Sequence, residues 1–163
     1  MMYVLGISMV IVGYLYIRVL NRIKQLEVKV KEASANIDVA LQKRYFVISQ
    51  LFEVAKGYVK YEKEVLMSVI EIREGMSVPE KEEVFDVLEA DYARVRGLIE
   101  HYPDLKGNDV FLKLQEGIVD TEEHLAAARR LYNANVSRFN QAISKFPGNI
   151  ITSVDEKEYL SFS

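Results

Sequence analysis

Apolar residues spaced three and four positions apart run through residues 21–74 and dominate the chain. Such steps are the period of an α-helix that buries one stripe of side chains. No proline interrupts the run, and Gly57 costs only about 1 kcal/mol relative to alanine. We therefore predict one helix from Asn21 to Glu74, with Glu62 as its main polar interruption. Its stripe comprises Ile23, Leu26, Val30, Ala33, Ile37, Leu41, Tyr45, Ile48, Phe52, Ala55, Val59, Leu66 and Ile70, and reaches Arg73.

An uncharged segment precedes this helix. Met1 to Ile17 contains no charged side chain, and extension to Leu20 gives a helix of about 30 Å, the thickness of a bilayer's hydrocarbon core. A cleaved signal peptide would place positive charge before its apolar run and a small-residue cleavage site after it. Here positive charge follows the run, and no Ala-x-Ala precedes Asn21. A buried core helix would carry a polar face, which is missing. We predict an uncleaved transmembrane anchor over residues 1–20.

Basic residues follow the predicted anchor directly. From Arg18 to Lys31 five basic side chains stand against Glu27 alone, a local charge of +4 in a chain whose total is −3. Basic flanks stay in the cytoplasm, so we predict a single-pass cell-membrane protein with its N-terminus outside and its bundle cytoplasmic. The same side chains can contact anionic lipid at about 1 kcal/mol each, although orientation and snorkelling explain them more simply. This basic collar comprises Arg18, Arg22, Lys24, Lys29 and Lys31.

Two further helices are predicted after the first. Pro79 follows Ser77 and precedes several acidic residues, a pattern typical of a helix start, and Pro103 ends that second helix. The third runs from about Val110 to Lys145, capped by the residue before it or by its neighbour in the turn of residues 107–109. Its stripe comprises Phe111, Leu114, Ile118, Thr121, Leu125, Ala128, Tyr132, Val136, Phe139 and Ile143.

The connections between these helices look short. Neighbouring helices joined by short connections run antiparallel. We therefore predict an all-α fold, an antiparallel up-and-down bundle of three long helices over residues 21–163. The tail from residue 150 is expected to dock as one or two further helical turns. The anchor over residues 1–20 should be continuous with the first bundle helix.

The residues that carry chemistry are sparse. There is no cysteine, which excludes disulfides, thiolate metal sites and thiol nucleophiles. A di-iron carboxylate bundle requires Glu-x-x-His on two helices, but Leu98 and Thr121 stand three positions before His101 and His124, the two histidines. Phosphate-binding loops, nucleophile elbows and paired zinc-binding histidines are also missing. We expect no enzymatic activity, no cofactor, no metal and no nucleic-acid partner.

Several polar residues fall on or beside the apolar stripes. They have two interpretations: a polar pocket or partner-contact surface, or inter-helix salt bridges and hydrogen bonds that fix the register of the bundle. The second is the simpler one. If the protein were an enzyme, which we consider as a further hypothesis for its function, its pocket would lie among Arg44, Glu122 and Arg129. The candidate polar seam comprises Arg44, Glu62, Glu122, Arg129 and Asn133.

Two blocks of residues, in matching order and spacing, resemble one known family. The first block comprises Asn36, Ile37, Asp38, Val39, Leu41, Lys43, Arg44, Tyr45, Leu51, Val54, Lys56, Gly57, Tyr58 and Glu62. The second comprises residues 102–106, Phe111, Leu114, Gln115, Thr121, Glu122, Ala128, Arg129, Tyr132, Asn133, Asn140, Phe146 and Pro147. From about residue 20 to 151 the chain resembles the LemA family of bacterial membrane proteins. The family usually has proline where this chain has Ser49, which leaves open whether the first helix kinks there.

The resemblance implies a helical bundle held at a membrane by one N-terminal helix, and it implies no reaction. Some relatives build or shape membrane organelles, and others are encoded beside membrane metalloproteases. Our first hypothesis is a non-enzymatic scaffold or adaptor in the bacterial cell envelope. The alternative is a membrane-remodelling or self-assembling protein whose basic collar holds anionic lipid. The expected partners are the lipid bilayer and other membrane or envelope proteins, with further copies of the chain as an additional option.

Overall fold

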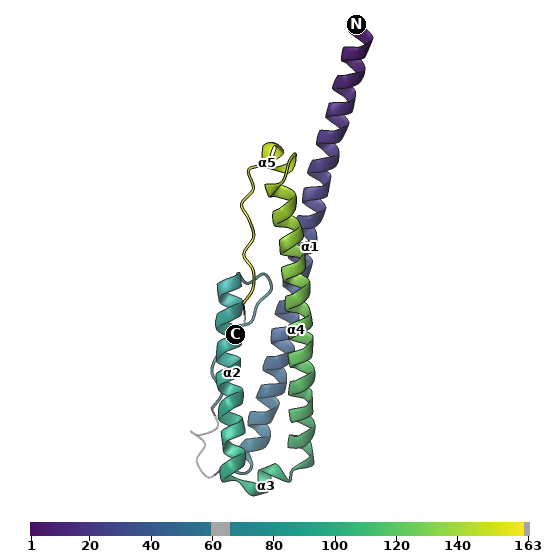
Figure 1. The fold of residues 1–163 in the computed structure, drawn as a ribbon. Helices are drawn as coiled ribbons and strands as arrows, with labels where there is room; N and C mark the ends of the chain where they lie inside the picture. Colours follow the sequence, from purple (N-terminus) through teal and green to yellow (C-terminus); the bar gives the residue numbers. More distant parts are fainter. Residues whose placement is uncertain (60–65, 162–163) are drawn as a thin grey trace. The chain divides into compact units, whose positions relative to one another are not determined.

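The computed structural model describes residues 1–59 and 66–161, and these residues form helices and no strand. The helices are α1 (Met2–Lys56), α2 (Val78–His101), α3 (Pro103–Lys106), α4 (Asp109–Ser144) and α5 (Gly148–Ile151), as drawn in Figure 1. The predicted all-α class is therefore confirmed. The chain divides into two compact units. Unit 1 comprises Met1–Ser34 and Leu131–Tyr159, and unit 2 comprises Ala35–Arg130 and Leu160–Ser163, so that α1 and α4 contribute to both.

Helix α1 runs without a break from the predicted anchor into the first bundle helix. The predicted stripe is buried at Ile23 and again, at intervals, as far as Ala55. The helix continues through Ser49, whose hydroxyl donates to the carbonyl oxygen of Phe46 at 2.7 Å. A serine in this position bonds within its own helix and leaves the backbone ladder intact.

The predicted continuation of this helix to Glu74 is wrong, because α1 ends at Lys56. The amides of Gly57 and Tyr58 bond to carbonyl oxygens three residues back, which tightens and closes the last turn. Residues 66–74 are not helical, and Leu66, expected on the buried stripe, is 56 % exposed. Glu62 lies outside the described residues.

The non-helical residues 66–77 obtain backbone partners from the helices of unit 2. The amide of Ser68 donates to Asp91 Oδ2 at 3.1 Å, and the amide of Gly75 donates to Asp38 Oδ2 at 3.0 Å. Lys81 Nζ donates to the carbonyl oxygen of Met76 at 2.8 Å. Irregular backbone cannot satisfy itself as a helix does, so these polar side chains complete its hydrogen bonds. Gly75 has a φ of 78°, which favours glycine.

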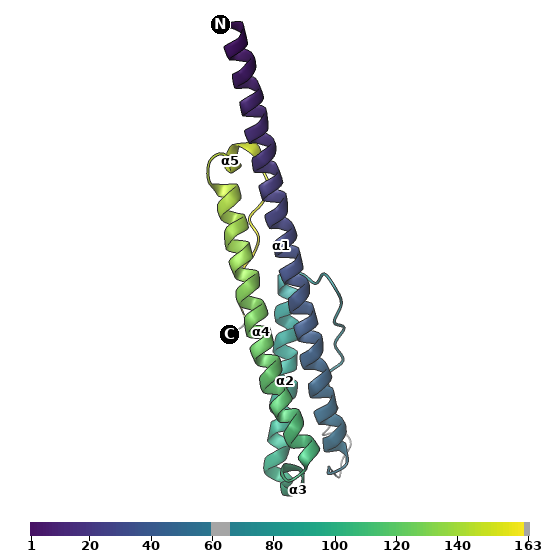
Figure 2. The same ribbon diagram turned by 90° about the vertical axis from the view of Figure 1, so that its right-hand side faces the viewer.

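Within unit 2, α1 and α2 run in the same direction. Asp38 pairs with Lys81 near the start of both segments, and the guanidinium of Arg94 lies 5.6 Å from the ring centre of Phe52 near their ends. The predicted antiparallel arrangement of the first two long helices is therefore wrong. Figure 2 shows the reason: the chain after residue 66 runs back beside α1 before α2 begins. A long return connection allows parallel neighbours, whereas a short one does not.

Helix α4 runs opposite to α1 within each unit. In unit 2, Gly117 of α4 approaches the side chain of Val47, whereas Asn108, just before α4, donates to the hydroxyl of Tyr58 at 2.8 Å. In unit 1, Asn135 Nδ2 donates to the carbonyl oxygen of Lys29 at 3.4 Å. Later residues of α4 thus meet earlier residues of α1, so the two helices are antiparallel. An up-and-down order of three helices would make the first and third parallel, so this part of the prediction is also wrong.

The starts of α2 and α4 are both capped, α4 by one of the two residues predicted for it. Ser77 is the N-cap of α2, and its amide donates to Glu80 Oε2 at 2.7 Å, while Pro79 lies in the first turn. This hydrogen bond from the Ser77 amide, with a second from its hydroxyl, holds the pKa of Glu80 below its usual value. At the start of α4, Asn108 Oδ1 accepts from the amide of Phe111 at 2.9 Å.

The tail of unit 1 is helical only in the single turn α5. After residue 151 it continues as non-helical backbone, so of the one or two helical turns expected here one is present. Asn140 holds this tail at both backbone groups of Lys157, donating to its carbonyl oxygen and accepting from its amide, each at 2.9 Å. The hydroxyl of Tyr132 donates to the carbonyl oxygen of Glu158 at 3.1 Å. Extended backbone beside a helix needs such external partners.

Candidate functional site

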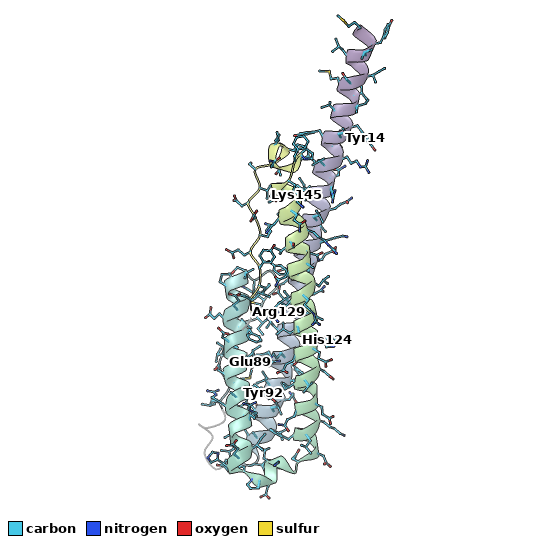
Figure 3. The ribbon with its side chains drawn as sticks, in the orientation of Figure 1. Tyr14, Glu89, Tyr92, His124, Arg129 and Lys145 are labelled. Atoms are coloured by element: carbon cyan, nitrogen blue, oxygen red, sulfur yellow. The ribbon has the colours of Figure 1, made fainter. Side chains whose placement is uncertain are left out.

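The N-terminal section of α1 exposes nearly all of its large apolar side chains. Exposure ranges from 48 % at Tyr16 to 83 % at Tyr3, and Figure 3 shows Tyr14 on this section. By length and composition α1 contains a candidate membrane span, and none of the 18-residue apolar stretch that identifies it is buried. Along α1, Val19 is the first half-buried side chain and Ile23 the first buried one, close to the predicted end of the anchor. A bare apolar cylinder of this length is unfavourable in water and matches the interior of a bilayer.

All five residues of the basic collar are exposed on the turns of α1 that follow this section. Lys24 Nζ lies 2.9 Å from Glu27 Oε2. The hydrogen bond from Lys24 is the main cause that holds the pKa of Glu27 below its usual value. The collar therefore presents cations to the solvent immediately beyond the apolar section, which is the arrangement that orients single-span proteins.

The polar seam centres on Arg44 in unit 2. Its side chain is 1 % exposed, and its Nη2 bonds Glu89 of α2 and, at 3.2 Å, Glu122 Oε1 of α4. Its Nε and Nη1 have no acceptor among the described residues. Arg44 reaches this position because it follows the buried stripe residue Leu41 by three positions. The guanidinium thus joins three helices through charge-assisted hydrogen bonds.

A pocket of about 280 Å³ lies beside this cluster, between α2 and α4. Arg44, Glu89, Glu122 and Arg129 line it, and Figure 3 labels Glu89 and Arg129 on their helices. Three predicted seam residues, Arg44, Glu122 and Arg129, therefore come together. Asn133 belongs to unit 1, and the fifth member, Glu62, lies outside the described residues.

A second buried ion pair escaped the sequence reasoning. Lys81 of α2, 1 % exposed, pairs with Asp38 of α1, which is 6 % exposed. The signal was present, because Lys81 precedes the buried Val84 by three positions and thus shares its helix face. Glu89, the partner of Arg44, was also missed, since it lies one position away from the buried Leu88.

Both clusters consist of ion pairs that link neighbouring helices of unit 2. Each buried cation is matched by carboxylates on another helix, and Lys81 also holds the connection between α1 and α2. Among residues 1–59 and 66–161, no group of three His, Asp or Glu side chains is placed to hold a metal ion. Buried ion pairs between helices are the kind of contact that can fix the register of a bundle.

Comparison with known proteins agrees with the earlier resemblance. The LemA family sequence model matches residues 33–162, so the match begins later than expected and includes the tail. Protein LemA of Metamycoplasma hominis is 26 % identical over 143 residues, which is 85 % of this chain and 65 % of the relative. Magnetosome protein MamQ of Magnetospirillum gryphiswaldense is 30 % identical over 69 residues, or 40 % of this chain and 25 % of the relative.

A second magnetosome protein, MamQ 2 of Paramagnetospirillum magneticum, is 32 % identical over the same length of 69 residues. The chain thus spans 65 % of the length of the first of these relatives and 25 % of each of the magnetosome proteins. The family match covers unit 2 as far as residue 162 and, of unit 1, residues 33–34 and 131–159; it includes Asp38, Arg44 and Lys81. The chain belongs to the LemA family.

Proposed function

We propose that this chain is a single-pass protein of the bacterial cell membrane, a non-enzymatic scaffold or adaptor whose helical part binds other envelope proteins. Residues 1–20 form the anchor and residues 21–163 the helical domain. The observation that carries the proposal is the exposed apolar section of α1, which ends where packing against the rest of unit 1 begins. The exposed basic collar beyond it favours an outside N-terminus and a cytoplasmic domain.

The distribution of buried charge supports a structural role. Arg44 and Lys81 bond to carboxylates of neighbouring helices, and Lys81 and Asp38 also bond to the backbone that links α1 to α2. Groups committed to such contacts are poorly placed to exchange protons with a substrate. A rigid helical body on a membrane anchor suits a protein that positions others.

Flotation of membranes through a density gradient after an alkaline carbonate wash tests the anchor. The full chain should float with the membranes. Met9→Arg combined with Val12→Arg should move most of it to the soluble fraction, because each charge at the centre of a span costs about 2.5–3.5 kcal/mol. Met9→Leu with Val12→Leu is the matched control and should float as the parent does. A parent chain that washes free of membranes would overturn the proposal.

A second candidate function is membrane remodelling or self-assembly. It is favoured by the basic collar and by the magnetosome proteins among the relatives. Electron microscopy of vesicles that carry the full-length chain separates the two. A scaffold leaves vesicles spherical at any protein density, whereas a remodelling protein produces tubules or constrictions whose number rises with density.

A further inference from the structure

A pocket of about 320 Å³ lies in unit 1 where α1 leaves its exposed apolar section. Arg22 of α1, Arg138 of α4 and Lys145, the residue after α4, supply its three charged side chains, and no acidic residue of the described chain lines it. None of these three cations forms an ion pair within the described part of the chain, although Lys145 Nζ donates to Gln141 Oε1 at 3.2 Å. The pocket is therefore a concentration of unneutralised positive charge.

The rest of the pocket is apolar and adjoins an exposed apolar turn. Val19 and Ile23 line it from α1, and Phe146 lines it from the turn after α4. Phe146 is 79 % exposed, and Ile150 on the same turn is 74 % exposed. These two exposed apolar side chains lie beside the cationic pocket, so the surface combines an apolar part with a basic part.

The turn after α4 is held in place by a close backbone contact between Gly148 and Ala142. A Cβ atom on Gly148 would lie 1.9 Å from the carbonyl oxygen of Ala142, so this position accepts only glycine. Because of this contact, the turn lies against the last residues of α4. Figures 1 and 2 both show α5 beside α1, just below the exposed section. The position of Phe146 at the pocket is thus built into the fold of unit 1.

The depth of the pocket follows from the helix rise. If the exposed section crosses the hydrocarbon core, the next two turns, Val19–Leu26, span about 11 Å beyond it. The headgroup layer on each side of a bilayer is about 5–8 Å thick. Arg22 and its pocket therefore lie at the level of the phosphates, and the exposed turn lies where interfacial apolar residues insert.

We propose that this pocket binds the phosphate of an anionic phospholipid, while Phe146 and Ile150 insert beside its acyl chains. The proposal rests on the membrane anchoring proposed above. Guanidinium groups match phosphate oxygens with paired donors, and Lys145 adds a point charge. Because no carboxylate offsets the three cations, the pocket favours a lipid with net negative charge over a zwitterionic one. The residues Lys29 and Lys31 of the collar are not part of it.

Tryptophan fluorescence of the full-length chain in vesicles tests this site, because the chain contains no native tryptophan. The reporter is Phe146→Trp, and the quencher is a phospholipid brominated near the headgroup end of its chains. At equal mole fraction, brominated phosphatidylglycerol should quench the reporter at least about twofold more than brominated phosphatidylcholine. Arg138→Glu with Lys145→Glu should abolish that preference. Lys29→Glu with Lys31→Glu is the matched control of equal charge change and should retain it.

Three outcomes overturn the lipid site. They are a reporter that neither lipid quenches, a preference that both double variants lose equally, and a preference that millimolar glycerol phosphate abolishes. The last would assign the pocket to a free phosphate ester. A second reporter, Tyr14→Trp, follows the anchor itself. If bilayer quenchers miss Tyr14→Trp as well, the anchoring proposal fails; if they reach it and miss Phe146→Trp, only the lipid site fails.

Discussion

The two units hold their non-helical segments by different chemistry. In unit 2 the connection after α1 is held by charged side chains: Asp38 accepts from the amide of Gly75, and Lys81 donates to the carbonyl oxygen of Met76. In unit 1 the tail is held by neutral groups, the amide of Asn140 and the hydroxyl of Tyr132. The described ion pair of unit 1, Lys24 with Glu27, is local and exposed.

This difference follows from what surrounds each segment. In unit 2 the connection starts α2 in the same direction as α1, and buried charges from both helices converge on it. A buried charge that loses its partner is costly, whereas a neutral amide that loses one costs much less. Unit 2 should therefore tolerate loss of a charged partner poorly, and unit 1 should show smaller effects.

The largest effect is expected for Lys81→Met. It leaves the carboxylate of Asp38 buried with the Gly75 amide as its one remaining partner among the described residues, and should lower the free energy of unfolding by about 3–5 kcal/mol. Urea titration of the full chain in mild detergent, with hydrogen exchange at residues 66–77 as the local probe, measures it. Lys56→Ala, which breaks an exposed pair with Glu53, is the control and should stay within about 0.5 kcal/mol. Equal effects of the two changes would contradict the account.

A smaller loss is expected for Arg44→Met. Its partners Glu89 and Glu122 are 41 % and 51 % exposed, so water can solvate them once the guanidinium is gone. The expected loss is about 2–3 kcal/mol by the same titration. Arg44→Lys keeps the positive charge but lacks the planar guanidinium with its several donors. It should therefore recover only part of the lost stability. Full recovery by lysine would show that the geometry of the guanidinium is unimportant.

In unit 1, Asn140→Ala removes both hydrogen bonds to Lys157 and should cost about 1–3 kcal/mol. The direct readout is faster hydrogen exchange at the amide of Lys157, since that amide loses its acceptor. The neighbouring change Gln141→Ala alters an exposed side chain and should leave this exchange rate unaltered. Loss of protection throughout unit 2 as well would contradict the local role given to Asn140.

The smallest effect concerns alkaline pH. Burial, with a lesser contribution from the charge of Glu158, raises the pKa of Tyr132 above its usual value of 10.0. The folded state therefore keeps the proton longer than the unfolded state. This contribution to stability is complete below about pH 10 and is lost as pH rises through the raised pKa. Tyr132→Phe should cost about 1 kcal/mol at neutral pH, from the lost bond to residue 158, and flatten the decline above pH 10. An unchanged decline would contradict the assignment.

The helix faces were predictable because a 3.6-residue period leaves a clear pattern in α1, α2 and α4. The end of α1 was not, because Val59, Leu66 and Ile70 continue that period beyond the helix. The parallel course of α1 and α2 depends on this same return connection and was missed with it.

The candidate site was predictable in part. Three residues of the predicted polar seam, Arg44, Glu122 and Arg129, line one pocket, and a role for that pocket stays a prediction. The pair of Asp38 and Lys81 was missed, since a lysine on an apolar face shows no partner until the three-dimensional contacts are known.

Topology mapping tests the central claim most directly, that the apolar section of α1 crosses the membrane and leaves the helical domain in the cytoplasm. The chain has no native cysteine, so Met2→Cys and the exposed position Ser153→Cys can each be probed in intact cells with a membrane-impermeant maleimide. Met2→Cys is expected to be labelled in intact cells, and Ser153→Cys only after permeabilisation. Labelling of Ser153→Cys alone in intact cells would contradict it, because the domain would then face outward despite its basic collar.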